Sequence, residues 1–142
     1  MGVRQLVVCM LAAGTTLFAV GAVFHLTIPI IAPDIPPQFK NDNLFRPWDG
    51  WTSTYMAFHP FGFGVLFASI YWVLRRQGGV SPGWRGGLMY GSGVFVVGSL
   101  PVFSLVFASF QVSSEVIVSW ITQSLCQYLA AGAVVGWVSS RR

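Results

Sequence analysis

The two histidines of the chain lie inside strongly apolar stretches, where a titratable ring is uncommon. His25 stands near the end of the first stretch, and His59 stands near the start of the second, directly before Pro60. Counting about 1.5 Å per helical residue places His59 roughly 10 Å, and His25 roughly 5 Å, inside the same face of a membrane. Glu115 begins the fourth apolar stretch at that face. Ionisable side chains in membrane segments are rare and mark functional sites, so we predict an outward-facing pocket at these residues.

Other polar and aromatic side chains converge on this predicted pocket. The fourth stretch repeats polar residues every four positions, which places them on one helix face with Glu115. The loop before the second stretch is rich in aromatic residues and would cover the pocket. The residues predicted to form the pocket are His25, Arg46, Trp48, Asp49, Trp51, His59, Pro60, Glu115, Ser119, Gln123 and Gln127.

Three kinds of binding chemistry fit this set of residues. His25 and His59 are the minimum for two axial ligands of haem b, with Arg46 available to pair a propionate. The same histidines with Glu115 offer imidazole and carboxylate ligands to a metal such as zinc or copper. A quinone, a sterol-like molecule or another small amphipathic ligand would accept a hydrogen bond from a histidine at its carbonyl, under aromatic cover.

Structural roles account for some of the same residues without a ligand. Glutamine and serine side chains hydrogen-bond neighbouring membrane helices, Asp49 is placed to cap a helix, and Glu115 suits the positive end of a helix dipole. The chain contains no HExxH motif, no phosphate-binding GxGxxG and no Ser, His and Asp set. A membrane enzyme that uses His59 as an acid or base is the least favoured function.

We therefore predict a non-catalytic membrane protein. Its predicted role is to bind a small amphipathic ligand in the pocket or to act as a subunit of a membrane complex or a homo-oligomer. The alternative is a b-type haem-binding electron-transfer protein with His25 and His59 as axial ligands.

The elements that must position these residues are membrane spans. Hydrophobic residues make up 54% of the 142 residues and charged residues only 8%, which is typical of an integral membrane protein and not of a soluble domain. Four apolar stretches, residues 5–28, 52–74, 86–109 and 116–138, each reach the roughly 20 residues that a span needs. We predict an all-α integral membrane protein, a four-transmembrane-helix bundle that forms a single domain over residues 1–142.

Basic residues orient this predicted bundle in the membrane. One side carries most of them, namely Arg4, Arg75, Arg76, Arg85, Arg141 and Arg142, and the other carries Lys40 and Arg46. The positive-inside rule then predicts cytoplasmic N and C termini, in a multi-pass protein of the bacterial inner (plasma) membrane. Nucleic acid is excluded as a partner because the basic residues punctuate apolar runs instead of clustering on a soluble face. Residues 1–22 also fit a cleaved signal peptide, although their apolar run is longer than a usual signal core.

Prolines shape the expected path on the outer side. In the outer loop, residues 29–51, the four prolines at 29, 33, 36 and 37 predict an extended or turn-rich path and not a helix. Pro60 has two interpretations. Either it kinks the second span and exposes a carbonyl beside His59, or it begins that span after a separate interfacial helix over residues 51–58.

Glycines indicate where the spans touch, because membrane helices approach closely at small residues. Gly87 and Gly91 form a GxxxG pair in the third span, and Gly98 follows one heptad later. Gly14 and Gly21 share one face of the first span with His25. We predict helix contacts at all five glycines.

Overall fold

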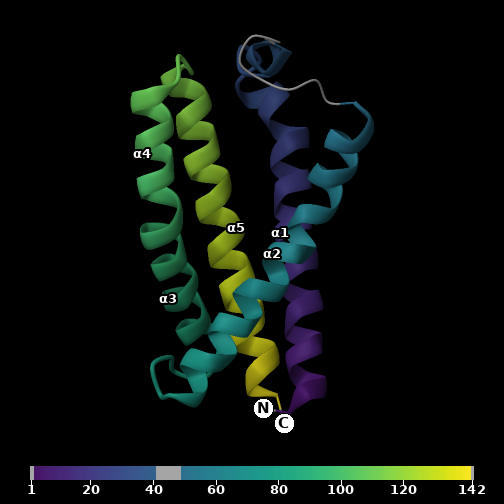
Figure 1. The fold of residues 1–142 in the computed structure, drawn as a ribbon, viewed down its shortest axis with the longest axis vertical. Coiled ribbons are helices and arrows are strands. Elements are labelled where there is room, and N and C mark those ends of the chain that lie inside the picture. The colour runs from purple at the N-terminus through teal and green to yellow at the C-terminus, as the bar shows by residue number, and fades with distance from the viewer. Residues whose placement is uncertain (1, 41–48, 142) are drawn as a thin grey trace.

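The computed structural model describes residues 2–40 and 49–141. All regular secondary structure in these residues is helical, and turns connect the helices. Its elements in chain order are α1 (Val3–Ile31), the 3₁₀ turn η1 (Pro36–Lys40), α2 (Gly50–Arg76), α3 (Trp84–Val94), the π-helical segment η2 (Phe95–Ser99), α4 (Leu100–Ser109) and α5 (Ser114–Ser140). Because α3, η2 and α4 follow without a break, they form one rod, Trp84–Ser109. The long rods run roughly alongside one another, and the two chain termini lie at the same end (Figure 1).

Three of the helices are long and apolar enough to cross a membrane: α1, α2 and the Trp84–Ser109 rod. Their sides expose large apolar residues such as Leu26, Ile70 and Val97, as expected of helices that face lipid. The fourth predicted span corresponds to α5, which has 27 residues but carries the polar row that includes Gln123 and Gln127. Its passage through the membrane stays a prediction.

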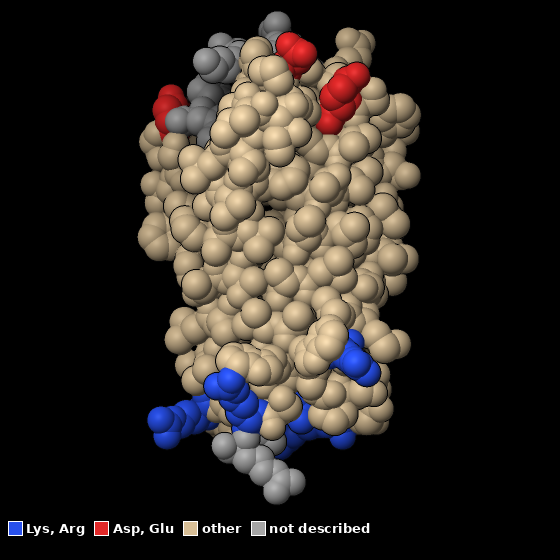
Figure 2. Space-filling view, turned by 180° about the vertical axis from the view of Figure 1, so that it is seen from behind, with Lys and Arg blue, Asp and Glu red and all other residues tan. Residues whose placement is uncertain are grey.

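Charged side chains separate to the two ends of the molecule. Figure 2 shows the described Asp and Glu side chains at one end and the described arginines toward the other, with a wide uncharged band between them. We call these the acidic end and the basic end. The acidic end holds the end of α1, the start of α2 and the α4–α5 turn, and the basic end holds both termini and the α2–α3 turn. This separation fits a bundle that stands across a membrane.

Glycines allow two pairs of helices to touch backbone to backbone. A Cβ on Gly64 of α2 would stand 2.6 Å from the Cα of Gly14 in α1, where the two helices cross. On the other side of the bundle, a Cβ on Gly87 of α3 would overlap the carbonyl of Gly132 in α5, and Gly91 meets the carbonyl of Tyr128 in the same way. No other residue type fits at these contacts without displacing a helix.

The other two predicted contact glycines differ from each other. A Cβ on Gly21 would stand 2.8 Å from Nε2 of Gln127, so this glycine makes room for a side chain of α5. Gly98 is exposed and has no atom within 4 Å of a Cβ position. Gly98 lies within the π-helical segment Phe95–Ser99, whose i→i+5 hydrogen bonds make each turn wider than an α-helical turn. Heptad counting therefore misplaces Gly98, which faces away from α5.

Aromatic side chains fill the middle of the bundle. The ring of Tyr90 in α3 lies edge-on to Phe67 of α2, with 4.7 Å between centroids, and its hydroxyl donates to the Phe67 carbonyl at 2.7 Å. Tyr128 of α5 stacks on Phe63 at 5.4 Å and lies 6.4 Å from Phe95. We call Phe63, Phe67, Tyr90, Phe95 and Tyr128 the aromatic layer. It joins α2, α3, η2 and α5 at mid-height.

Two proline predictions need correction. α1 continues through Pro29 to Ile31, and Pro36–Lys40 forms a 3₁₀ turn, so the start of the outer loop is more helical than expected. α2 is continuous from Gly50 to Arg76 with Pro60 inside it, so the separate helix over residues 51–58 does not exist. Proline in a helix interior removes one hydrogen bond but does not end the helix when the freed carbonyl finds another donor.

Candidate ligand-binding cavity at the acidic end

A cavity of about 710 Å³ lies at the acidic end between α1, α2 and α5, with Phe103 of α4 at its edge. Its polar lining consists of His25, Thr52, His59, Ser119, Gln123, Ser124 and Gln127. Its aromatic lining consists of Phe24, Phe39, Trp51, Tyr55, Phe103 and Trp120. We call it the histidine cavity. Its size and its mixture of apolar walls with a few polar groups are those of small-molecule sites.

The structure brings many of the predicted pocket residues together at this cavity. Those that line it are His25, Trp51, His59, Ser119, Gln123 and Gln127. Pro60 is buried and does not line the cavity, while Asp49 and Glu115 are exposed and lie outside its lining. Arg46 and Trp48 fall outside the described residues.

Pro60 determines how His59 is held. Proline has no N–H, so the carbonyl of Met56, four residues earlier, lacks its helical donor. Nδ1 of His59 lies 3.0 Å from that carbonyl oxygen and takes the place of the missing donor. Because a carbonyl can only accept, Nδ1 carries the proton, and Nε2 of the neutral ring is an acceptor. The expected donation from a histidine to a ligand carbonyl therefore does not fit neutral His59.

The His59 ring is also held from the side. The ring of Tyr55, one helical turn earlier, stacks on it with 5.7 Å between centroids and 17° between planes. Trp51 in turn lies edge-on to Tyr55 at 6.3 Å. The first two turns of α2 thus form an aromatic wall that ends at the His59 imidazole. Such a wall restricts the ring without occupying Nε2.

The polar row on α5 forms the facing wall, and its donors are partly used within the protein. The Ser119 hydroxyl donates to the Val116 carbonyl at 2.7 Å. The Gln127 amide donates to the Leu17 carbonyl of α1 at 2.8 Å, which fastens α5 to α1. Between them, Gln123 lines the cavity, and its amide makes no hydrogen bond within the described part of the chain. Gln127 therefore has the bridging role expected of membrane glutamines, and Gln123 is available to a ligand.

Glu115 and Asp49 take positions typical of helix starts. Ser113 is the N-cap of α5, and its side chain accepts from the Val116 N–H. Hydrogen bonds from its own backbone N–H and from Ser113 lower the pKa of the Glu115 carboxyl, which stands in the first turn of α5. Asp49 is the N-cap residue of α2, but its side chain makes no capping hydrogen bond. Glu115 thus suits the positive end of the α5 dipole.

A metal site gains no third ligand from this arrangement. Residues 2–40 and 49–141 contain no group of three or more His, Cys, Asp or Glu side chains placed to hold a metal ion. Cys9 is buried in the core, and Cys126 is exposed on α5. His25 and His59 are the two potential ligands that share the histidine cavity.

Sequence reasoning did not include several residues of the cavity wall. Tyr55 had a signal, because it precedes His59 by four positions and so lies on the same helix face. Trp120 and Ser124 are next to members of the polar row on α5. No pattern in the sequence indicated Phe103, because the π-helical segment before it sets which face of α4 turns toward the cavity.

Comparison of the chain with models of protein families, with curated proteins and with solved structures gives no match. Fold and cavity define the class: an all-helical protein with three helices long and apolar enough to cross a membrane and a mixed polar and aromatic cavity at its acidic end.

Proposed function

We propose that this chain is a four-span, multi-pass protein of the bacterial inner membrane that binds a small amphipathic molecule in the histidine cavity. Its two termini lie on the cytoplasmic side, and α5 is the fourth span. It acts as a binding protein or as a binding subunit of a membrane complex, without catalysis of its own. The observation that carries this proposal is the cavity itself, about 710 Å³ with aromatic walls and a polar row.

The hydrogen-bonding groups of the cavity favour a ligand with a hydroxyl. His59 uses its one donor on Met56, so its Nε2 remains an acceptor. Gln127 gives one N–H to Leu17 and keeps its Oε1 as an acceptor and its second N–H as a donor. The Gln123 amide offers both an acceptor and a donor. The hydroxyls of the lining adapt to either role. A ligand with only acceptors would leave His59 Nε2 and Gln127 Oε1 unpaired, which is unfavourable in an apolar cavity.

A matched pair of probes tests this proposal. 4-Nonylphenol and its methyl ether have nearly the same shape, but only the phenol donates a hydrogen bond. Isothermal titration calorimetry in detergent should show saturable binding of both, with the phenol about fivefold tighter, as one hydrogen bond of about 1 kcal/mol implies. His59→Phe and Gln123→Leu should reduce this preference. Thr122→Val is the control, because Thr122 lies on α5 outside the cavity and bonds its own helix.

The outcomes separate the two parts of the proposal. If the folded wild-type protein binds neither probe saturably, the histidine cavity is not a site for amphipathic molecules. If it binds both equally, the cavity is a site but the preference for a hydroxyl is refuted. Equal losses in Gln123→Leu and Thr122→Val would place binding elsewhere.

Haem b is the second candidate, because both histidines line one cavity. Histidines that bind a metal donate their other ring N–H to a carbonyl or carboxylate, as His59 does through Nδ1. Nε2 of His59 is therefore in the right state for an axial ligand. An oxidised and dithionite-reduced absorption spectrum of protein expressed with ample haem tests this candidate. A Soret band that both His25→Ala and His59→Ala abolish would support it, and a featureless spectrum of folded protein would exclude it.

A further inference from the structure

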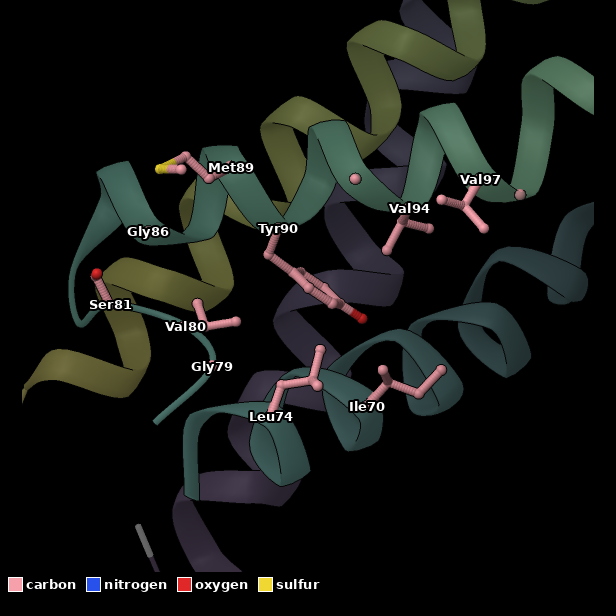
Figure 3. Close-up of a pocket in the computed structure, with 12 residues that line it drawn as sticks. Ile70, Leu74, Gly79, Val80, Ser81, Gly86, Met89, Tyr90, Val94 and Val97 are labelled. Carbon is pink, nitrogen blue, oxygen red and sulfur yellow. The ribbon is translucent and has the colours of Figure 1, made fainter. Parts of the chain in front are cut away.

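A second hollow, the lateral cleft, lies at the basic end between α2 and α3. It has a volume of about 580 Å³ and lies between the last turns of α2, the α2–α3 turn, and α3 with η2. Figure 3 shows Ile70 and Leu74 facing Tyr90, Val94 and Val97 across it. The helices on both sides are long and apolar enough to cross a membrane. The cleft therefore opens sideways at a depth where a membrane has hydrocarbon.

Two glycines keep this cleft open. Gly93 and Gly98 line it, and neither has an atom within 4 Å of a Cβ position. Gly87 and Gly91, on another face of the same rod, are used in the contact with α5. Side chains at 93 and 98 would thus fit the chain but would fill the cleft.

Polarity changes along the cleft. Its floor between the helices is apolar, while the α2–α3 turn contributes Ser81 and backbone groups at the end nearest the basic surface. Arg85, at the start of α3, directly precedes Gly86 and lies one helical turn from Met89, and both of these line the cleft. Arg75 and Arg76 end α2 just before the turn but line a separate hollow with Trp72 and Ser139, and Arg75 donates to the Ser139 hydroxyl. The described acidic side chains gather at the opposite end (Figure 2), so these arginines have no carboxylate neighbours there.

We propose that the lateral cleft binds one anionic phospholipid, with an acyl chain between α2 and α3 and its phosphate beside the α2–α3 turn, at Arg85 and the polar groups of that turn. The apolar walls match a hydrocarbon chain, and the uncompensated positive charge matches a phosphate. A helix of a partner is a poorer fit. With a diameter of about 10 Å, a helix would place only roughly one turn in this volume.

Native mass spectrometry of the full chain in mild detergent tests the proposal. We expect a one-to-one adduct with added phosphatidylglycerol that is stronger than the adduct with phosphatidylcholine of the same chains. Gly93→Leu should abolish the adduct because it fills the cleft. Gly62→Leu is the matched control, because Gly62 on α2 also has open space at its Cβ but does not line the cleft. Gly98→Leu serves as a second variant if Gly93→Leu does not fold.

The arginines are tested separately from the cleft. Arg85→Gln should weaken phosphatidylglycerol about fivefold, which is the effect of one basic residue near an anionic lipid, and should leave phosphatidylcholine unchanged. Arg76→Gln is the control, because Arg76 lines a separate hollow and should weaken phosphatidylglycerol less. Equal adducts for the two lipids in the wild type would refute the role of charge. Adducts of equal strength in the Gly93→Leu and Gly62→Leu variants would refute the cleft as the binding site.

Discussion

The hydrogen bond between His59 and Met56 exists because of Pro60, and this dependence can be measured. In the wild type, Nδ1 of His59 lies 3.0 Å from the carbonyl oxygen that Pro60 leaves without a donor. In Pro60→Ala, the new backbone N–H can bond the same carbonyl in the ordinary helical way. The His59 ring then becomes dispensable for that carbonyl. A double-mutant cycle over Pro60→Ala and His59→Ala isolates the bond.

The expected coupling is about 1 kcal/mol, the net value of one hydrogen bond to a backbone carbonyl. His59→Ala also removes the stacking on Tyr55, and Pro60→Ala leaves space around a buried ring. Each of these losses occurs with and without the other mutation, so both cancel in the cycle. His59→Ala should therefore destabilise the wild type by about 1 kcal/mol more than it destabilises Pro60→Ala.

Reversible unfolding in mixed detergent micelles, followed by circular dichroism, gives the four free energies of unfolding. If the two mutations are additive within about 0.3 kcal/mol, a limit typical of independent sites, His59 does not serve the carbonyl of Met56. The assignment of the proton to Nδ1, and with it the acceptor at Nε2, would then be refuted.

Three other features lead to predictions, at the α3–α5 contact, the start of α5 and the chain ends. Gly87→Leu should lower the free energy of unfolding by about 1–3 kcal/mol, because its Cβ would overlap the Gly132 carbonyl. The same unfolding assay on Gly62→Leu is the control, and an equal or larger effect there would contradict the α3–α5 contact. The pKa of Glu115 is lowered from 4.5 by hydrogen bonds in the folded state, so its stabilisation is present above pH 4.5 and is lost as the pH falls through the folded pKa. Glu115→Gln should flatten this part of a melting profile, and an unchanged profile would exclude the effect. Alkaline phosphatase should be active when inserted after Gln111 in the α4–α5 turn and inactive when fused to the C terminus, whereas equal activity would show that α5 does not cross.

The sequence predicts the helices well because hydrocarbon leaves a chain few alternatives. Backbone groups in lipid must be bonded within the helix, so apolar stretches become helices wherever they are long enough. The predicted stretch 116–138 corresponds to α5, Ser114–Ser140, and the stretch 52–74 corresponds to α2, Gly50–Arg76. The outer prolines were harder to interpret, because each only removes one donor, and its effect depends on what else can bond the freed carbonyl.

The sequence predicted residues of the candidate site only where helical periodicity alone determines which side chains share a face. The four-residue spacing of Ser119, Gln123 and Gln127 places them on one face, and all three line the histidine cavity. The same spacing misplaced Glu115, because the first turn of α5 extends beyond the cavity to solvent. Which nitrogen of the His59 ring carries the proton could not be predicted without knowing that α2 continues through Pro60 without a break.

The histidine cavity and the lateral cleft are separate hollows, and this separation bears on the proposed function. No lining residue is common to the histidine cavity and the lateral cleft. Between them stands the aromatic layer, where the Tyr90 hydroxyl donates to the Phe67 carbonyl and Ser99 donates to the Tyr128 hydroxyl at 3.2 Å. The aromatic layer contributes Tyr90 to the lining of the lateral cleft and none of its residues to the lining of the histidine cavity. This arrangement suits a binding site that is entered and left from one side, and it keeps a lipid in the lateral cleft from competing for the histidines.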